Sequence, residues 1–389
     1  MSDEFELLIV GGGPAGLAAA RSYRDAEGQG AVAIVTDEQR MPYNRPPLTK
    51  ELLRREISED ELPIEDETWL AEQRVSLVSG RAVSLDRDGR TVALSGGRRI
   101  AFTSCVLATG AEPKRLPVPG VDDPAVRILR SLDHLRELER RLAGGGQVVV
   151  IGSGFIGCEI AASLRSRGHE VTLISDETAP NVARLGDEAA AEIASWLRQD
   201  GVQLRMGTEV ESIERSGETL HVVAGDIRSS APLVVMAAGV APRSELAAAA
   251  GLELEQGAVP TDAGMRTVAE GLLAAGDVCL AQNTAAGRRL RVEHWGDALS
   301  QGSVAGSIAA GVEAGWNDVP GFWSTIGSRT LKYAAWGDGY EQARMERRDG
   351  GAFTVWYGGS DRIVGVLTHQ ADEDYERGRE LIAEGAPWS

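Results

Sequence analysis

Short apolar runs alternate with helix-like segments along this chain, and the first such unit is the clearest. Residues 6–10 form an apolar run that leads directly into a glycine-rich turn, and residues 17–24 follow it as a helix-like stretch. A second apolar run covers residues 31–35. This pattern predicts a β-α-β unit of about thirty residues.

The same unit recurs in the middle of the chain, where residues 147–151 lead into a second glycine-rich turn and a second helix. Both turns read Gly-x-Gly-x-x-Gly, a spacing that allows a tight turn, close approach to a pyrophosphate and close helix–strand packing. The helix N-terminus that follows favours phosphate binding. The turns predict two dinucleotide sites, or one site and one empty inherited fold. Their candidate cofactor-binding residues are Gly11, Gly13, Pro14, Ala15, Gly16, Gly152, Gly154, Phe155, Ile156 and Gly157.

The rest of the chain predicts further strands, and the pattern of residues changes near the C-terminus. Apolar runs over residues 98–108, 233–238 and 272–275 each end at a glycine-containing turn. From about residue 321, aromatic residues become frequent and alternate with polar ones, which is typical of antiparallel strands. The last segment, residues 372–384, is predicted to be helical.

Composition narrows the class of partner. The chain has 389 residues and a formal net charge of −18, and this length predicts two or three domains. Such acidity argues against nucleic acid or an anionic membrane as a partner. The acidic start, Met1 to Glu6, lacks the basic region of a signal peptide, and no apolar run is long enough to span a bilayer. A cytoplasmic protein is therefore expected.

The cysteines and histidines do not form the patterns expected of a redox disulfide or a metal site. The three cysteines, Cys105, Cys158 and Cys279, form no CxxC pair and are expected to be buried and apolar in role. The five histidines show no metal-ligand spacing, so no metal site is predicted.

Acidic residues follow the second strand of both β-α-β units. Asp37 lies at the distance from the first glycine turn at which a carboxylate binds a ribose hydroxyl. Asp176 and Glu177 occupy the matching place after the second turn and would favour NADH over NADPH, because a 2′-phosphate would be repelled. A solvated turn without a ligand is the alternative for this second pair.

Several motifs together resemble one family. Residues 42–50, Pro-Tyr-Asn-Arg-Pro-Pro-Leu-Thr-Lys, are similar to the PYxRPPLSK segment of the FAD-dependent ferredoxin reductases, which include the rubredoxin, putidaredoxin and biphenyl-dioxygenase reductases and their relative, apoptosis-inducing factor. Further matching motifs occur at residues 108–110, 154–159, 276–277 and 292–295. The resemblance is strong over residues 5–311 and weaker in the tail.

The resemblance implies an α/β fold with two Rossmann-like dinucleotide-binding domains, arranged as in glutathione reductase, and a small α+β C-terminal domain. The FAD domain would comprise residues 1–112 and 240–320, with the NAD(P) domain, residues 113–239, inserted between them. An interface domain would run over residues 321–389.

The resemblance also implies roles for single residues. Asp37 would bind a ribose hydroxyl, Asp277 would bind the ribityl chain, and Trp295 would lie beside the isoalloxazine. Lys50 would approach flavin N5, and Glu159 is predicted to pair with it between the domains. The alternatives are an exposed lysine and a glutamate that complements a helix dipole. The other residues assigned to cofactor binding are Arg45, Val83, Ala108, Thr109, Gly110, Arg130, Gly239, Gly276, Glu293 and His294.

The leading functional hypothesis is an NADH-dependent ferredoxin reductase with FAD and NAD as cofactors, NADP remaining possible. It would pass electrons to a ferredoxin-type iron–sulfur protein that serves an oxygenase. An NADH-binding redox sensor similar to apoptosis-inducing factor and a flavin-dependent NADH oxidase are the alternatives. A local arginine cluster, Arg344, Arg347 and Arg348, could steer an acidic partner, and a solvated hairpin edge without a partner is the alternative. A monomer and a homodimer both remain open.

Overall fold

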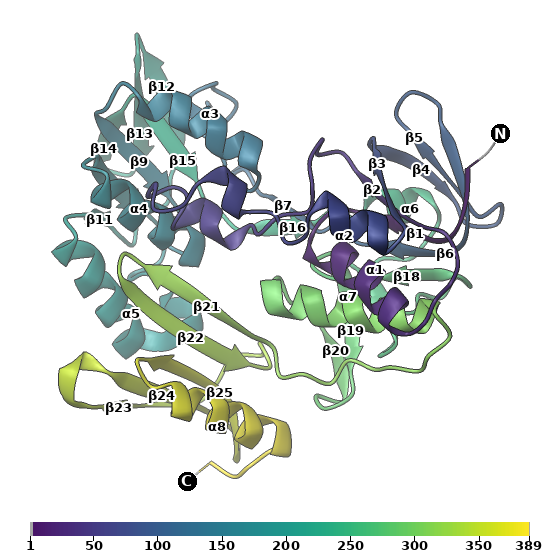
Figure 1. Ribbon diagram of the computed structural model, residues 1–389. Helices are drawn as coiled ribbons and strands as arrows, with labels where there is room; N and C mark the ends of the chain where they lie inside the picture. The colour runs from purple at the N-terminus through teal and green to yellow at the C-terminus, as the bar shows by residue number, and fades with distance from the viewer. Residues whose placement is uncertain (1–2, 389) are drawn as a thin grey trace.

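The computed structural model describes residues 3–388, and Figure 1 shows that the chain folds into three parts. The first part contains a sheet of order β3-β2-β1-β6-β5-β4, with β18 paired to β6. Its β1, β2, β3, β6 and β18 run parallel, whereas β4 and β5 are antiparallel additions. The strands are β1 (Asp3–Val10), β2 (Val32–Thr36), β3 (Val75–Ser79), β4 (Ala82–Asp86), β5 (Thr91–Leu94), β6 (Arg99–Leu107) and β18 (Leu272–Ala274).

The central strands of this sheet are apolar on both faces. Leu7, Leu8 and Ile9 of β1 are fully buried, and every residue of β2 is buried. Parallel strands with both faces covered are continuous apolar runs of this kind. The helix that follows β1, α1 (Pro14–Asp25), begins with a proline. Proline fits the first helical position because the N–H it lacks would be unpaired there.

Helix α7 (Trp295–Ala309) lies directly against α1 because it presents glycines to it (Figure 1). A β-carbon at Gly302 would lie 2.2 Å from the carbonyl oxygen of Ala15, and one at Gly306 would lie 2.2 Å from that of Ala19. This close packing brings the start of α7, near residue 295, next to the first glycine turn.

The second part repeats the architecture with a parallel sheet of order β11-β10-β9-β15-β8. A three-stranded antiparallel sheet, which the sequence pattern did not indicate, extends from it. The elements are β8 (Val126–Arg127), α3 (Leu132–Leu142), β9 (Gln147–Ile151), α4 (Phe155–Ser166), β10 (Glu170–Ile174), α5 (Val182–Gln199), β11 (Gln203–Arg205), β12 (Ser212–Ser216), β13 (Thr219–Ala224), β14 (Ile227–Ala231) and β15 (Leu233–Met236).

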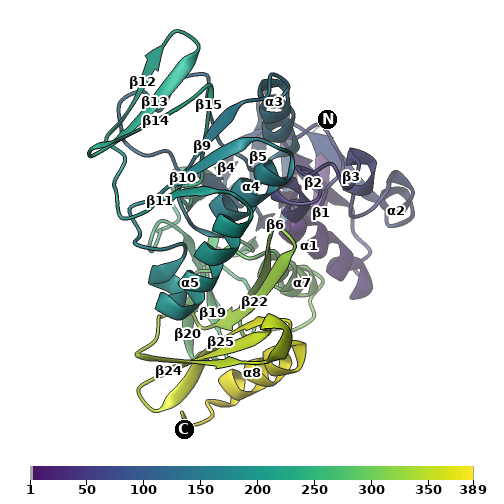
Figure 2. The same ribbon diagram turned by 90° about the vertical axis from the view of Figure 1, so that its left-hand side faces the viewer.

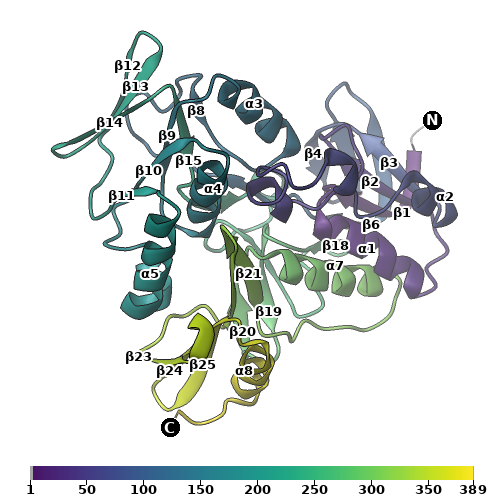
Figure 3. The ribbon, with the colours of Figure 1, turned by 60° about the vertical axis from the view of Figure 1, so that its left-hand side comes forward.

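The third part is an antiparallel sheet of order β21-β22-β25-β24-β23 with one helix, α8, packed on it. In the view turned by 90° from Figure 1, this third part lies at the opposite end of the molecule from β12–β14 (Figure 2). Strand β21 contacts both α4 and α7, so it touches both other parts (Figure 3). The elements are β21 (Gly321–Ile326), β22 (Arg329–Ala335), β23 (Gln342–Arg347), β24 (Phe353–Gly359), β25 (Arg362–His369) and α8 (Asp372–Glu384).

The chain passes between the first two parts through a pair of short antiparallel strands, β7 (Ala111–Pro113) and β16 (Val240–Pro242). The fold class predicted from sequence, two dinucleotide folds and a small α+β unit, is confirmed. We propose that the domain boundaries near residues 112, 240 and 320 lie at this crossing and before β21. The remaining elements are α2 (Glu67–Glu72), α6 (Glu245–Ala249), β17 (Val259–Thr261), β19 (Cys279–Asn283), β20 (Arg288–Leu290) and three 3-10 helices, η1 (Pro46–Thr49), η2 (Glu59–Glu61) and η3 (Asp349–Gly351).

Candidate active site

A cleft of about 2080 Å³ lies where the three parts meet. Small-molecule sites usually measure about 300–1,000 Å³, so the cleft has room for more than one ligand. Although the chain carries a net charge of −18, nine Lys/Arg and nine Asp/Glu residues line the cleft. The predicted site residues in its lining are Gly11, Gly13, Pro14, Ala15, Asp37, Arg45, Lys50, Val83, Ala108, Thr109, Gly110, Arg130, Gly154, Phe155, Ile156, Glu159, Gly276, Asp277, Glu293, His294 and Trp295.

The first glycine turn has the geometry of a pyrophosphate cradle. Gly11 has a φ of +130°, and a β-carbon there would lie 2.0 Å from the carbonyl oxygen of Ala108. A β-carbon at Gly16 would meet the Gly11 carbonyl at 2.0 Å, so that glycine serves packing and lies outside the cleft lining. A β-carbon at Gly13, in contrast, would meet nothing within 4 Å. Gly13 therefore leaves the space that an approaching phosphate needs.

The second turn repeats these constraints. Gly152 has a φ of +103°, and its β-carbon would lie 2.3 Å from the Ala237 carbonyl oxygen. A β-carbon at Gly157 would lie 2.0 Å from the Gly152 carbonyl oxygen, whereas one at Gly154 would meet nothing within 4 Å. Gly152 and Gly157 are thus packing positions outside the cleft lining, and Gly239 after β15 also lies outside it. Each turn fits the diphosphate of a dinucleotide.

The predicted ion pair between Lys50 and Glu159 is present in the structure. Lys50 Nζ lies 3.0 Å from Glu159 Oε2, and the two side chains are only 5% and 3% exposed. The Thr49 hydroxyl donates to the same oxygen at 2.5 Å, and the Ser324 hydroxyl donates to Glu159 Oε1 at 2.7 Å. The carboxylate is therefore held by donors from η1 and from β21.

One face of α4 joins the first two parts, and we call this contact the α4 interface. Glu159, Ser163 and Arg167 are spaced by four residues and so share a face of the helix. The Ser163 hydroxyl donates to the Thr49 carbonyl at 2.8 Å, and Arg167 donates to the Leu53 carbonyl at 3.1 Å. These contacts hold α4 of the second part against residues 49–53 of the first part.

At the end of β2, Glu38 is more strongly bound to its surroundings than its neighbour Asp37. Glu38 accepts from the Tyr43 hydroxyl at 2.6 Å and from Arg45 at 2.5 Å. Burial works to raise the pKa of the Glu38 carboxyl, but the charge of Arg45 and these two hydrogen bonds outweigh it and lower the pKa. The Asp37 carboxylate lies 3.9 Å from Arg243 and remains half-exposed at the cleft.

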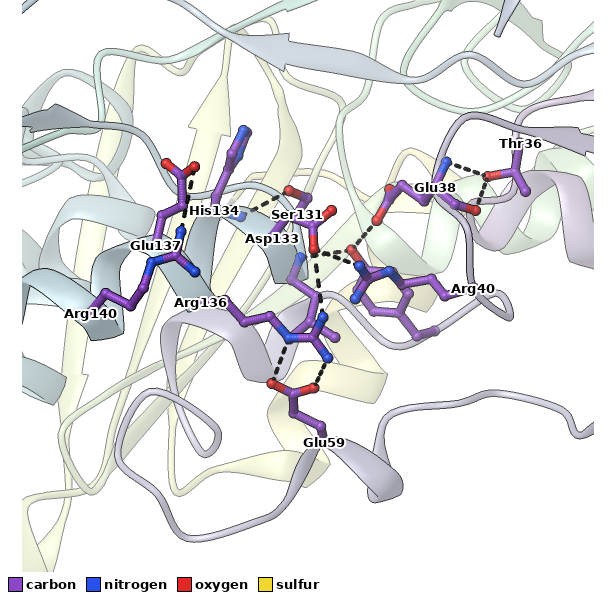
Figure 4. Close-up of polar contacts among 12 residues, drawn as sticks. Thr36, Glu38, Arg40, Glu59, Ser131, Asp133, His134, Arg136, Glu137 and Arg140 are labelled. Carbon is purple, nitrogen blue, oxygen red and sulfur yellow. Dashed lines mark hydrogen bonds and ion pairs between the residues drawn. The ribbon is translucent and has the colours of Figure 1, made fainter. Parts of the chain in front are cut away.

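Ion pairs link this loop to α3, whose first residues also line the cleft. Arg40 pairs with Asp133 at 2.5 Å, and Arg136 reaches both Asp133 and Glu59 (Figure 4). The Tyr43 hydroxyl accepts from the backbone N–H of Leu132 at 3.0 Å. Burial, opposed by the charge of Arg45, raises the pKa of Tyr43 to about 12.

At the end of β10 the structure distinguishes two adjacent acidic residues. Asp176 is exposed and lies outside the cleft lining, whereas Glu177 lines the cleft. The Ser153 hydroxyl donates to Ser175 at 2.9 Å and lies 3.3 Å from Glu177 Oε2. Contact of Asp176 with the nucleotide stays a prediction, and Glu177 is the better-placed carboxylate.

Near the start of α7 the cleft wall is aromatic and charged. Arg130 pairs with Asp277 at 2.6 Å, and His294 Nδ1 lies 3.0 Å from Asp297. The Phe322 ring packs against His294 and, edge-on, against Phe155, with both pairs of centroids 4.7 Å apart. Phe155 of the second glycine turn thus contacts the C-terminal sheet across the cleft.

None of the three cysteines lines the cleft, and all are buried. Burial raises the pKa of each thiol above its ordinary value. Within residues 3–388, no group of three or more His, Cys, Asp or Glu side chains is placed to hold a metal. Over the same residues, every helix is too short or too polar to cross a bilayer.

The family model described as pyridine nucleotide-disulphide oxidoreductase matches residues 5–302. The chain belongs to this family. Family membership and the named relatives identify it as an oxidoreductase with FAD and NAD(H) as cofactors. The relatives described in the next paragraph confirm the resemblance to ferredoxin reductases that the motifs indicate.

Three relatives show how far the similarity extends. The ferredoxin–NAD(+) reductase component of an anthranilate 1,2-dioxygenase system of Burkholderia cepacia is 32% identical, covering 97% of this chain and 94% of that protein. The crystal structure of the ferredoxin reductase for the CYP199A2 system from Rhodopseudomonas palustris matches with a TM-score of 0.94 at 30% identity, covering 100% and 96% of the two chains. A covalent putidaredoxin reductase–putidaredoxin complex matches with a TM-score of 0.92 at 28% identity, covering 99% and 94%.

Sequence reasoning missed the hydroxyl groups around Glu159. Thr49 lies inside the 42–50 motif, but its side chain was assigned no role. Ser324 lies in the tail, where the resemblance to the family is weaker, and no role was assigned to it. Its contact with Glu159 joins residues 165 positions apart, a separation that local patterns do not reveal.

Proposed function

We propose that this protein is an NADH-dependent ferredoxin reductase. It would accept hydride from NADH onto FAD and pass single electrons to a ferredoxin-type iron–sulfur protein that serves an oxygenase. The supporting observation is that two glycine turns with equivalent geometry border one cleft, with the Lys50–Glu159 pair between them. The names of the relatives support the same activity.

FAD supplies the conversion between two-electron and one-electron transfer, and the chain supplies binding and alignment. Gly13 leaves room for one diphosphate and Gly154 for the other. Lys50 brings a buried positive charge to the cleft, where charge is poorly screened and stabilises developing negative charge strongly. Glu159 compensates Lys50, and the Phe155–Phe322 contact covers the cleft with apolar surface.

We assign the nicotinamide preference to Glu177. Its carboxylate lines the cleft at the end of β10, where a ribose would be bound in a fold of this kind. A 2′-phosphate in that place would meet negative charge, which supports NADH over NADPH.

The iron–sulfur partner would dock at the mouth of the cleft. Trp323 is 46% exposed and lines the cleft together with Trp336, and tryptophan is enriched in protein interfaces. The arginine cluster of β23 supports docking less well, because Arg347 pairs with Glu192 and Arg348 with Asp374. The similarity to the reductase of the covalent putidaredoxin complex supports a protein partner of this kind.

Cytochrome c reduction tests the proposal. Purified, flavin-loaded protein with NADH should reduce cytochrome c slowly by itself and many times faster when an iron–sulfur ferredoxin is added. Equal rates with and without ferredoxin, over a range of ferredoxins from oxygenase systems, would contradict the proposed function. A cytoplasmic location is part of the proposal, and a monomer and a homodimer both agree with it.

The NADH oxidase alternative needs a cysteine beside the flavin, and none of Cys105, Cys158 and Cys279 lines the cleft. The redox-sensor alternative is less well supported, because the relatives described above are named as reductases. A stable NADH-dependent change of oligomeric state without turnover would favour that alternative.

A further inference from the structure

Glu159 is the point at which all three parts of the molecule meet. Its Oε2 accepts from Thr49 and Lys50 of the first part, and its Oε1 accepts from Ser324 of the C-terminal sheet. Glu159 itself belongs to α4 of the second part. Ser324, Thr49, Lys50 and Glu159 are all at least 95% buried.

The two carboxylate oxygens are therefore held by donors from different parts of the molecule. Thr49 and Lys50 bond one oxygen, and Ser324 bonds the other at 2.7 Å. A hydrogen bond to a charged group is stronger than one between neutral groups and fixes the geometry of the acceptor. Without the Ser324 hydroxyl, the carboxylate could rotate about its last bond and change how it meets Lys50.

Ser324 is well placed to be rigid. It lies in β21, the strand that contacts both α4 and α7, and its neighbours Phe322 and Trp323 line the same cleft. Ser324 lines the cleft as well, but its hydroxyl is directed to Glu159. A buried hydroxyl on an edge strand that packs against both other parts can orient a carboxylate without itself touching a bound nucleotide.

We propose that Ser324 is a positioning residue for hydride transfer. Through it the C-terminal sheet sets the orientation of Glu159 and, through Glu159, the position of the Lys50 ammonium at the flavin site. This proposal rests on the NADH-to-FAD part of the proposed function and not on the identity of the electron acceptor. Flavin reduction by NADH can be measured without ferredoxin. A failure of the Ser324 proposal can therefore be told apart from a failure of the ferredoxin assignment.

The decisive comparison is Ser324→Ala against Ser163→Ala in the flavin-loaded protein. Both variants remove one buried hydroxyl at a contact with α4, but Ser163 bonds the Thr49 carbonyl rather than Glu159. We expect S324A to slow anaerobic flavin reduction by NADH about tenfold, the effect of one hydrogen bond to a charged group. The dissociation constant of NADH should stay unchanged, and S163A should remain within about twofold of wild type.

A second readout follows Lys50 directly and does not depend on activity. The chain contains only three lysines, Lys50, Lys114 and Lys332, so lysine-selective ¹⁵N labelling gives few ammonium signals. The variants K114R and K332R assign the other two. The Lys50 signal should shift or broaden in S324A and stay in place in S163A.

The proposal is overturned if S324A is reduced at the wild-type rate, or if S163A matches S324A in both rate and Lys50 signal. If the alanine variant does not fold, the isosteric pair S324T and S324V decides instead. The threonine variant, which keeps a hydroxyl, should be reduced at least about fivefold faster than the valine variant. Equal rates for the pair would also overturn the proposal.

Discussion

At the scale of single residues, the molecule depends on one buried ion pair. Lys50 and Glu159 are almost fully buried, so bulk solvent screens neither charge well. Removing one partner of a buried pair leaves the other charge uncompensated and typically costs about 3–5 kcal/mol. The pair thus helps to hold the first two parts together and is also a feature of the site.

The first prediction is that Glu159→Gln lowers the free energy of unfolding by about 3 kcal/mol. Glu313→Gln is the matched control, because Glu313 is 83% exposed and pairs with Arg266 at the surface. We expect the control to lose less than about 1 kcal/mol. Urea unfolding of both flavin-loaded variants measures the difference, and equal losses would refute the buried-pair argument.

The second prediction concerns the pH dependence that Tyr43 introduces. Its pKa is raised from 10.0 to about 12 in the folded state. The folded state holds the Tyr43 proton more tightly than the unfolded state does. The stabilisation that this proton gives the folded state is therefore fully present below pH 10 and is lost as pH rises through about 12. The stability of Tyr43→Phe should therefore fall less steeply between those values.

At neutral pH the same variant should lose about 1.5–3 kcal/mol, because Glu38 loses a donor and the Leu132 N–H loses its acceptor. Urea unfolding at a series of pH values checks both effects. Parallel stability curves for wild type and Y43F above pH 10 would show that Tyr43 does not titrate as described.

At the scale of elements, the two glycine turns are equivalent in backbone geometry, and we propose that they bind different nucleotides. Gly13 and Gly154 both face open space, so an added methyl group fits the fold and occupies the place of a phosphate. Gly13→Ala should fold but bind FAD at least about tenfold more weakly. Gly154→Ala should keep its flavin and show a similar loss of NADH affinity.

Flavin content after purification and the NADH dependence of flavin reduction separate these two variants. The control is Gly144→Ala, a turn glycine outside the cleft lining that, like Gly13 and Gly154, has no positive φ and whose β-carbon would also meet nothing within 4 Å. If G13A retained flavin as well as G154A does, the assignment of the two turns would be wrong.

The end of β10 provides the next prediction. Glu177→Gln should improve the use of NADPH relative to NADH about tenfold, because one repulsive charge near a 2′-phosphate is removed. Asp176→Asn should change that ratio less than about twofold, since Asp176 is exposed and outside the cleft lining. Steady-state kinetics with both nucleotides tests this, and a larger effect at Asp176 would restore the assignment made from sequence.

These elements also show which features could be predicted from the sequence and which could not. The glycine turns were predictable because close contacts such as that of Gly11 with Ala108 permit no side chain, so the residue type records the geometry. Which of Asp176 and Glu177 faces the cleft was not predictable, because it depends on how the chain turns after β10. The β12–β14 sheet was missed because its strands are largely exposed or only half-buried, so polar residues interrupt them and they form no continuous apolar run.

At the scale of the whole molecule, the site exists only where three parts meet. The motif residues of each β-α-β unit could be named from sequence, and so could the Lys50–Glu159 pair once the resemblance was recognised. The contribution of the C-terminal sheet could not, because Ser324 reaches Glu159 across 165 positions and Phe322 reaches Phe155 in the same way. Long-range contacts of this kind come from packing rather than from local pattern.

The central claim is that separate nucleotides bind at the two turns and react in the shared cleft. Anaerobic titration of the purified, flavin-loaded protein with NADH, followed by visible absorbance, tests it most directly. We expect a yellow protein whose flavin band is bleached completely by about one equivalent of NADH per flavin, since each hydride carries two electrons. A preparation that binds no flavin when FAD is supplied, or a bound flavin that NADH leaves oxidised, would contradict it.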